Sequence, residues 1–265
     1  MNVLRTKKAG QPLRVTPSQL REVTPTMQTT TAVSTNIPLD SQPAKLRSTI
    51  YIDGFNWFFA IFRHFPQYKW LNVQSFFEEI RVDDNVVSIK YFTALVEPKP
   101  LVSARRSRQA LYLNALRQLP KVRVILGAYQ DREVTCRGSC RQQYLVPEEK
   151  KTDVNIAVHM IDDVINDTTD RIVLVSGDSD LEPAIAWVHK RYPDIKLNIY
   201  LPVLEEEKKN RRNDFYEKLG ATVKFLPLNL FGKHQLPNPA PGGFQRPASW
   251  AVLAAAEAAP SKNQR

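Results

Sequence analysis

Apolar residues recur along most of the chain in two alternating patterns. Short runs rich in β-branched and aromatic side chains are typical of buried strands, and they lie at residues 48–53, 86–95, 121–127, 172–175, 195–201 and 222–226. Stretches with helical periodicity or capping residues indicate helices between them, at residues 57–62, 72–81, 103–118, 152–166, 181–190 and 205–219. This alternation predicts an α/β fold, in which helices cover both faces of a mostly parallel sheet.

The two ends of the chain lack this alternation. Residues 1–47 show no period and contain several prolines, so we expect a disordered, basic tail there. Residues 232–265 are rich in Pro, Gly and Ala, and we expect a second disordered tail. The folded domain should therefore span residues 48–231. Most of the net charge of +10 lies in the tails, which suits loose phosphate binding, although solvated tails are commonly basic without a partner.

Composition excludes several classes of protein. Hydrophobic residues make up 43% of the chain, which is enough for a sizeable core. No apolar run approaches about 18 residues, so we expect no membrane span. The N-terminus lacks the apolar segment of a secretory signal. The two cysteines, Cys136 and Cys140, fit a reducing compartment, and we expect a cytoplasmic protein.

Residues 128–147 interrupt the alternation, and we interpret them as an irregular or hairpin insertion. Cys136 and Cys140 stand in it with C-x3-C spacing. Two thiolates are half of a zinc site, but no second pair of His or Cys stands at a fitting distance in the sequence. We therefore favour a reduced or redox-labile pair.

Carboxylates stand where two of the predicted strands end. Asp53 ends the first strand, and Asp178 and Asp180 follow the run 172–175 across a tight Ser-Gly turn. Asp153 would lie in the first turn of the helix predicted at 152–166, where the helix dipole favours an acid. Because the carboxyl ends of parallel strands meet at one edge of a sheet, we expect the four carboxyl groups within about 10 Å of a common point.

Two interpretations fit Asp178 and Asp180. An Asp is a favourable helix N-cap, and a second acid stabilises the helix dipole. However, four carboxylates in one crevice repel each other unless a cation lies between them. Oxygen-only donor sets suit Mg²⁺ or Mn²⁺, and two such ions could orient a water for in-line attack on a phosphodiester. The residues therefore also predict a metal site.

Three motifs resemble those of the NYN family of the PIN-like nuclease superfamily. They are Tyr-Ile-Asp-Gly-Phe-Asn at 51–56, Lys-Thr-Asp-Val-Asn at 151–155 and Ser-Gly-Asp-Ser-Asp-Leu at 176–181. The combination is specific because the motifs occur in order with helix-length gaps, whereas one alone would be weak. The resemblance spans about residues 48–229 and implies a PIN-like α/β/α sandwich, a divalent-metal site and activity on RNA.

The resemblance also implies roles for individual residues. The catalytic and metal-binding acids would be Asp53, Asp153, Asp178 and Asp180. The supporting polar groups would be Asn56, Thr152, Ser176 and Ser179. The function implied is that of a Mg²⁺- or Mn²⁺-dependent ribonuclease, which hydrolyses RNA phosphodiesters.

An RNA substrate would need cations near this site. The candidates are Arg105, Arg106, Arg108, Lys150 and Lys151. For the three arginines a solvated helix face is the alternative. We expect the aromatic residues of 57–62 to belong to the core and not to a base-stacking platform.

Two other functions stay open. Some family members that resemble this chain are associated with a monooxygenase activity, the NADH-dependent hydroxylation of a succinoyl-hydroxypyridine in nicotine degradation. The residues support that chemistry weakly, because the nine glycines form no G-x-G-x-x-G and no Cys/His set suggests haem or an iron–sulfur cluster. A catalytically silent RNA-binding or regulatory module is the third alternative, and the presence of all four carboxylates argues against it. The oligomeric state stays open.

Overall fold

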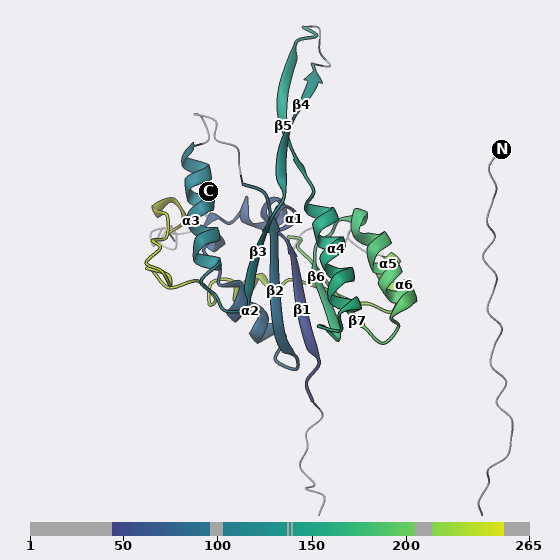
Figure 1. The fold of residues 1–265 in the computed structure, drawn as a ribbon. Helices are drawn as coiled ribbons and strands as arrows, with labels where there is room; N and C mark the ends of the chain where they lie inside the picture. The colour runs from purple at the N-terminus through teal and green to yellow at the C-terminus, as the bar shows by residue number, and fades with distance from the viewer. Residues whose placement is uncertain (1–43, 96–102, 137, 139, 205–213, 252–265) are drawn as a thin grey trace, which may run out of the picture. The chain divides into compact units, whose positions relative to one another are not determined.

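A six-stranded parallel sheet forms the centre of the protein, shown in a computed structural model that describes residues 44–95, 103–136, 138, 140–204 and 214–251 (Figure 1). The strand order is β3-β2-β1-β6-β7-β8. The strands are β1 (Arg47–Asp53), β2 (Asn85–Thr93), β3 (Val122–Leu126), β6 (Arg171–Val175), β7 (Lys196–Leu201) and β8 (Thr222–Phe225). The predicted α/β fold with a mostly parallel sheet is confirmed.

Helices cover both faces of this sheet, as an α/β/α sandwich requires (Figure 1). The first face carries α1 (Gly54–Trp57), the short helices η1 (Phe58–Phe62) and η2 (Pro66–Tyr68), α2 (Val73–Ile80) and α3 (Ser103–Leu116). The second face carries α4 (Thr152–Ile165), η4 (Ser179–Leu181), α5 (Glu182–Arg191) and α6 (Asp214–Lys218). Among the described residues, no helix has the length and apolar character needed to cross a bilayer.

The alternation of side chains along the strands builds a separate core on each face. In β1, Ile50 and Ile52 point into the first core, where they join Trp57. Tyr51 points into the second core, where it joins Ile156 of α4. Burial on both faces explains why the central strands read as continuous apolar runs in the sequence.

The order in which strands are added to the sheet reverses between β1 and β6. The strands β2 and β3 extend the sheet on one side of β1, whereas β6, β7 and β8 extend it on the other. After β1 the chain enters α1 on the first face, and after β6 it enters α5 on the second face. The two connections leave a crevice at the carboxyl ends of these neighbouring strands, which is where open α/β sheets place their functional sites.

Residues 128–150 form an antiparallel hairpin, with β4 (Ala128–Thr135) paired to β5 (Gln143–Lys150). The hairpin extends beyond the carboxyl end of the sheet (Figure 1). Cys136 and Cys140 lie at its tip as free thiols. The insertion expected at 128–147 is therefore a hairpin, and its second strand runs almost directly into α4.

The expected boundary at residue 231 lies too early. In the following segment, Leu236 and Ala240 are buried in the first core. The main-chain N–H of Leu236 donates to the carbonyl of Trp70 at 2.8 Å. The Trp250 ring, in the short helix η7 (Ala248–Trp250), packs 6.3 Å from that of Trp70. Residues 232–251 thus cover the core, whereas 1–43 and 252–265 of the expected tails lie outside the described residues.

Candidate metal centre

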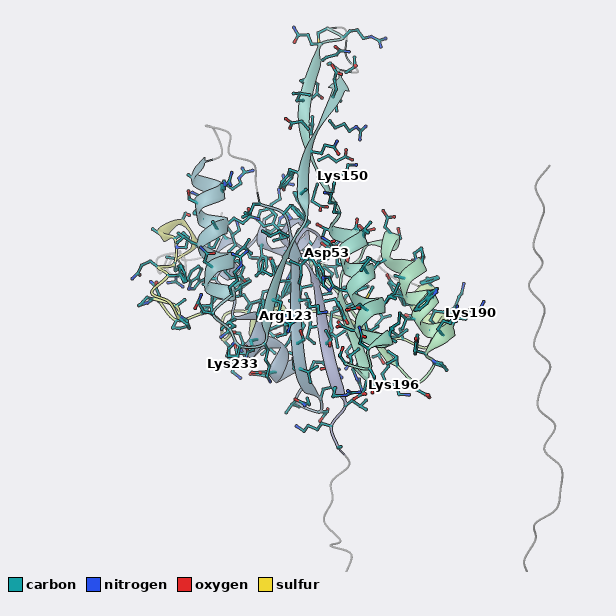
Figure 2. The ribbon with its side chains drawn as sticks, viewed as in Figure 1. Asp53, Arg123, Lys150, Lys190, Lys196 and Lys233 are labelled. Carbon is teal, nitrogen blue, oxygen red and sulfur yellow. The ribbon has the colours of Figure 1, made fainter. Side chains whose placement is uncertain are left out.

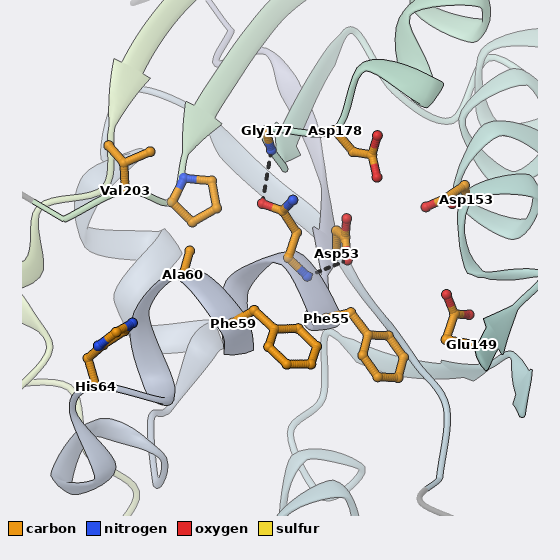
Figure 3. Close-up of a pocket in the computed structure, with 12 residues that line it drawn as sticks. Asp53, Phe55, Phe59, Ala60, His64, Glu149, Asp153, Gly177, Asp178 and Val203 are labelled. Carbon is orange, nitrogen blue, oxygen red and sulfur yellow. Dashed lines mark hydrogen bonds between the residues drawn. The ribbon is translucent and has the colours of Figure 1, made fainter. Parts of the chain in front are cut away.

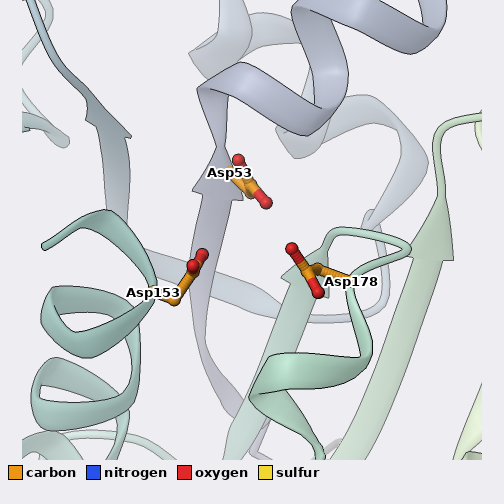
Figure 4. Close-up of side chains that lie close together, drawn as sticks. All are labelled: Asp53, Asp153 and Asp178. Carbon is orange, nitrogen blue, oxygen red and sulfur yellow. The ribbon is translucent and has the colours of Figure 1, made fainter. Parts of the chain in front are cut away.

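Three aspartates converge at the crevice between β1 and β6. Asp53 is the last residue of β1, Asp178 follows β6, and Asp153 lies in the first turn of α4. Each offers one carboxylate oxygen, and these three oxygens lie within 4.8 Å of one another (Figure 4). Within the described part of the chain, no Lys or Arg forms an ion pair with any of the three. The structure therefore brings together three of the four predicted acids.

Hydrogen bonds fix the position of Asp53. Its Oδ1 accepts the main-chain N–H of Asn56 at 2.9 Å, and its Oδ2 accepts the Ser176 hydroxyl at 2.8 Å. The Ser176 oxygen in turn accepts the N–H of Asp178 at 3.0 Å. The Asn56 side-chain oxygen accepts the N–H of Gly177 at 3.0 Å (Figure 3). Asn56 and Ser176 thus join the end of β1 to the turn after β6.

Asp178 is both a helix cap and a member of the acidic cluster. Its Oδ1 accepts the N–H of Asp180 at 3.0 Å, which caps η4. Asp180 is exposed and is not one of the three acids whose oxygens converge. Ser179 is likewise exposed in η4. The two interpretations of this acidic turn are therefore compatible.

Glu149 is a fourth carboxylate at the site, and the sequence did not reveal it. It lies near the end of β5 and lines the same pocket as Asp53 and Asp153. Its Oε1 accepts both the N–H and the hydroxyl of Thr152. A Cβ on Gly127 would lie 3.0 Å from that Oε1 and 2.8 Å from the Thr152 hydroxyl, so only glycine leaves room for this contact. Thr152 therefore supports the site through Glu149.

Burial and like charges raise the pKa of two acids in the cluster. For Asp153, burial and then the charges of Asp53 and Asp178 raise the pKa to about 6. Burial also raises the pKa of Asp53, although the hydrogen bonds from Asn56 and Ser176 oppose this rise. The charged forms of these acids are thus disfavoured without a cation. Because every donor is a carboxylate oxygen, the cluster fits a hard cation such as Mg²⁺ or Mn²⁺.

The acids form one wall of a pocket of about 460 Å³ (Figure 3). The opposite side is lined by Phe55, Phe59, Ala60, His64, Pro202 and Val203. The expectation that the aromatic residues of 57–62 are core is right for Trp57 and Phe62, which are buried. It is wrong for Phe59, which is 55% exposed. The spacing of four residues between Phe55 and Phe59 could have indicated that the two rings lie on the same side, because residues i and i+4 share a helix face.

The predicted RNA-binding cations lie outside the pocket lining. Arg105, Arg106 and Arg108 lie in the first turns of α3. Lys150 forms an ion pair with Glu148 at 3.2 Å. Lys151 is exposed and has a positive φ of 78° immediately before α4. Their role in RNA binding stays a prediction.

The cysteines of the hairpin tip do not belong to this site. The N–H of Gly138 donates to the Cys136 sulfur at 3.4 Å. The N–H of Gln142, followed by the Cys136 thiol, lowers the pKa of Cys140. The two cysteines are not joined by a disulfide.

Comparison with known proteins identifies related chains. The chain is 30% identical over 245 residues to the protein named 6-hydroxy-3-succinoylpyridine 3-monooxygenase HspA of Pseudomonas putida (strain DSM 28022 / S16), across 80% of this chain and 77% of that protein. A solved structure, that of a protein of unknown function, VPA0982, from Vibrio parahaemolyticus RIMD 2210633, aligns with a TM-score of 0.46 and 19% identity. That alignment covers 71% of this chain and 96% of the other.

The family assignment rests on the part of the chain that builds the site. The NYN domain family matches residues 47–217, from the start of β1 into α6. This range contains Asp53, Asp153 and Asp178 with their supporting groups. The chain therefore belongs to the NYN domain family, a family of PIN-like nucleases.

Proposed function

We propose that this protein is a Mg²⁺- or Mn²⁺-dependent ribonuclease that hydrolyses RNA phosphodiesters at the aspartate cluster. The observation that carries the proposal is the convergence of three carboxylate oxygens within 4.8 Å. Such an arrangement is unfavourable unless a cation offsets the repulsion. The nuclease character of the NYN family supports the same conclusion.

The chain's own residues would hold the reaction partners in place. Asp53, Asp153 and Asp178 would bind the cation, and the exposed Asp180 would add a ligand from the rim. When bound, a divalent cation stabilises negative charge that develops on the phosphate. The oxygen of a water forms a bond to phosphorus, the bond from phosphorus to the leaving ribose oxygen breaks, and the proton of the water ends on that oxygen. The hydrogen bonds of Asn56 and Ser176 keep Asp53 fixed during this exchange.

The substitution Asp178→Asn tests the proposal. An Asn oxygen can still accept the N–H of Asp180, so the helix cap is kept while one metal-binding charge is lost. Cleavage of a generic single-stranded RNA with Mn²⁺ should fall by roughly a hundredfold or more. The melting temperature without metal should hold or rise, because a repelling charge has gone.

A matched control is Asp194→Asn, which changes an exposed acid outside the pocket. It should leave cleavage and Mn²⁺ stabilisation unchanged. The proposal fails if Asp178→Asn cleaves RNA at the wild-type rate and is still stabilised by Mn²⁺ as the wild type is. If wild-type protein binds RNA but leaves it intact with Mg²⁺ and Mn²⁺, the silent module is the better description.

A second candidate rests on the name of the relative from Pseudomonas putida. A monooxygenase of a succinoyl-hydroxypyridine would consume NADH, and the rings of Phe55 and Phe59 give the pocket an aromatic side on which a pyridine could stack. The measurement is NADH oxidation with a panel of hydroxypyridines, beside the RNA assay. Substrate-dependent NADH oxidation without RNA cleavage would replace the ribonuclease proposal.

A further inference from the structure

Three cations gather on the first face of the sheet, next to the pocket. Lys69 follows η2, and Arg105 and Arg108 lie three residues apart in α3, on one side of that helix. The ammonium of Lys69 lies 6.0 Å from the centre of the Trp250 ring, and that ring packs 6.2 Å from Tyr112, one turn after Arg108 in α3. Burial lowers the pKa of Lys69, and the positive charges of Arg108 and Arg105 lower it further. Within the described part of the chain, none of the three forms an ion pair with a carboxylate.

Several cations elsewhere in the fold are paired with acids. Lys90 contacts Asp163 at 2.6 Å, and Lys233 contacts Glu79 at 2.6 Å. Cations that repel one another without a paired acid are unfavourable, and an anion between them would offset this cost. The cluster of Lys69, Arg105 and Arg108 therefore has the charge of an anion site.

One series of ring contacts connects this cluster to the pocket. The ammonium of Lys69 lies 5.2 Å from the centre of the Phe58 ring, and that ring meets Phe59 at 5.4 Å. The Phe59 side chain lines the pocket beside Phe55 (Figure 3).

A second connection is electrostatic and runs from Arg105 to Tyr129. Burial and Glu149 raise the pKa of Tyr129, and Arg105 is close enough to oppose that rise. The Tyr129 ring packs edge-on against Phe55 at 5.8 Å. The cation cluster thus borders the aromatic side of the pocket, and the aspartates lie on the other side.

We propose that Lys69, Arg105 and Arg108 form a subsite for a backbone phosphate of the RNA strand that the aspartates cleave. The strand would cross Phe55 and Phe59 between the two sites, and an unpaired base would stack on the exposed Phe59 ring. Base stacking on aromatic side chains requires unstacked nucleotides, so the substrate class is single-stranded RNA. This inference rests on the proposed ribonuclease function.

Binding of a fluorescein-labelled oligouridylate in EDTA tests the subsite without turnover. The variant Lys69→Gln/Arg105→Gln/Arg108→Gln should bind on the order of tenfold more weakly at low salt. Its plot of log affinity against log salt should be shallower by about 0.7, because one phosphate contact on a single strand contributes about that much. Melting temperatures near the wild-type value would show that the variant is folded.

The matched control removes three other exposed cations, in the variant Lys190→Gln/Lys196→Gln/Lys224→Gln. Figure 2 shows Lys190 and Lys196 away from Asp53. This control should keep the wild-type salt slope. Equal binding by the two triple variants would overturn the subsite, and equally tight binding of duplex RNA would overturn the single-stranded substrate class.

Cleavage assays separate the two proposals. The cluster variant should lose cleavage of the oligonucleotide at low substrate concentration while cleavage of a dinucleotide, too short to reach the cluster, stays unchanged. If no RNA is cleaved by the wild type but binding depends on the cluster, the ribonuclease proposal fails and the phosphate subsite stands. If both substrates are cleaved by the variant as by the wild type, the subsite fails and the ribonuclease stands.

Discussion

At the amino ends of the strands Asp84 and Asp170 are paired with arginines, whereas at the carboxyl ends of the same sheet acids gather without a cation. Arg47, at the start of β1, contacts Asp170 at 2.6 Å. Asp84, whose side chain is 2% exposed, accepts the Nε–H of Arg81 at 2.8 Å and lies 3.4 Å from Arg171 of β6. Buried charges are tolerated at this end because each one has a partner.

The pKa shifts at the two ends have opposite signs. The Arg47 side chain, through its hydrogen bonds, lowers the pKa of Asp170. Burial and neighbouring carboxylates raise the pKa of Asp153 to about 6 at the other end. A paired acid stabilises the fold, whereas an acid with a raised pKa opposes it at neutral pH. The difference separates acids that stabilise the structure from acids whose proposed role is to bind a cation.

Asp84→Asn should have the largest effect, on stability alone. It removes the carboxylate that Arg81 and Arg171 share, so both positive charges are left without an acid in a mostly buried position, which costs about 3 kcal/mol of unfolding free energy. Denaturant unfolding measures the loss. The exposed neighbour Asp83→Asn should be close to wild type. RNA cleavage well below the melting temperature should be unchanged, and a loss of activity there would show that the two ends are not independent.

The melting temperature, measured over a range of pH, should show opposite contributions from the acids at the carboxyl ends and at the amino ends of the strands. Because the folded-state pKa of Asp153 exceeds its ordinary value of 3.8, protonation favours the folded state. Its contribution is full below about pH 4 and is lost as pH rises through about 6. Without metal this should lower the melting temperature by a few degrees, and excess Mn²⁺ should offset the loss.

The folded-state pKa of Asp170 is lowered, so its contribution is present above about pH 4 and is lost in acid. Asp153→Asn should therefore flatten the metal-free dependence of the melting temperature on pH between about pH 4 and 6, and Asp170→Asn should flatten its acid side. If the melting temperatures of the two variants depended on pH in the same way, the proposed difference between the acids at the two ends of the strands would be wrong.

Glu149→Gln should have the smallest effect. Gln keeps an oxygen for the two Thr152 donors but removes a negative charge from the pocket. Mn²⁺ affinity, followed by calorimetric titration, should fall roughly threefold to tenfold. Glu148→Gln, which alters the residue paired with Lys150, should leave the affinity unchanged. If both variants bind Mn²⁺ equally well, Glu149 only positions Thr152.

Much of the fold and part of the site could be predicted because they follow from periodicity. Asp53 and Asp178 were located by their place after apolar strands, since parallel strands bring their carboxyl ends together. Asp153 followed from its position in the first turn of a helix. The orientation of Asp180 could not be predicted in this way, because hydrophobic periodicity does not indicate in which direction the second acid of a short turn points.

Other residues of the site depend on contacts that no local pattern encodes. Glu149 is placed by the register of β4 with β5, in which it pairs with Tyr129. Tertiary packing brings the charge of Arg105 near enough to Lys69 to lower its pKa. The segment 232–251 has the composition of a linker, yet its main chain pairs with Trp70 and its apolar residues cover the core.

The junction between the hairpin and α4 has a consequence for how the chain tolerates insertions and deletions. A single residue, Lys151, separates β5 from α4, so the number of residues at this junction sets the rotational phase of the helix. Adding or removing one residue there would turn α4 by about 100° and carry Asp153 away from Asp53. Length changes at the tip, among residues 136–142, leave that phase untouched. The β4–β5 hairpin can therefore vary in length at its tip. At its base, the number of residues between β5 and α4 must stay the same.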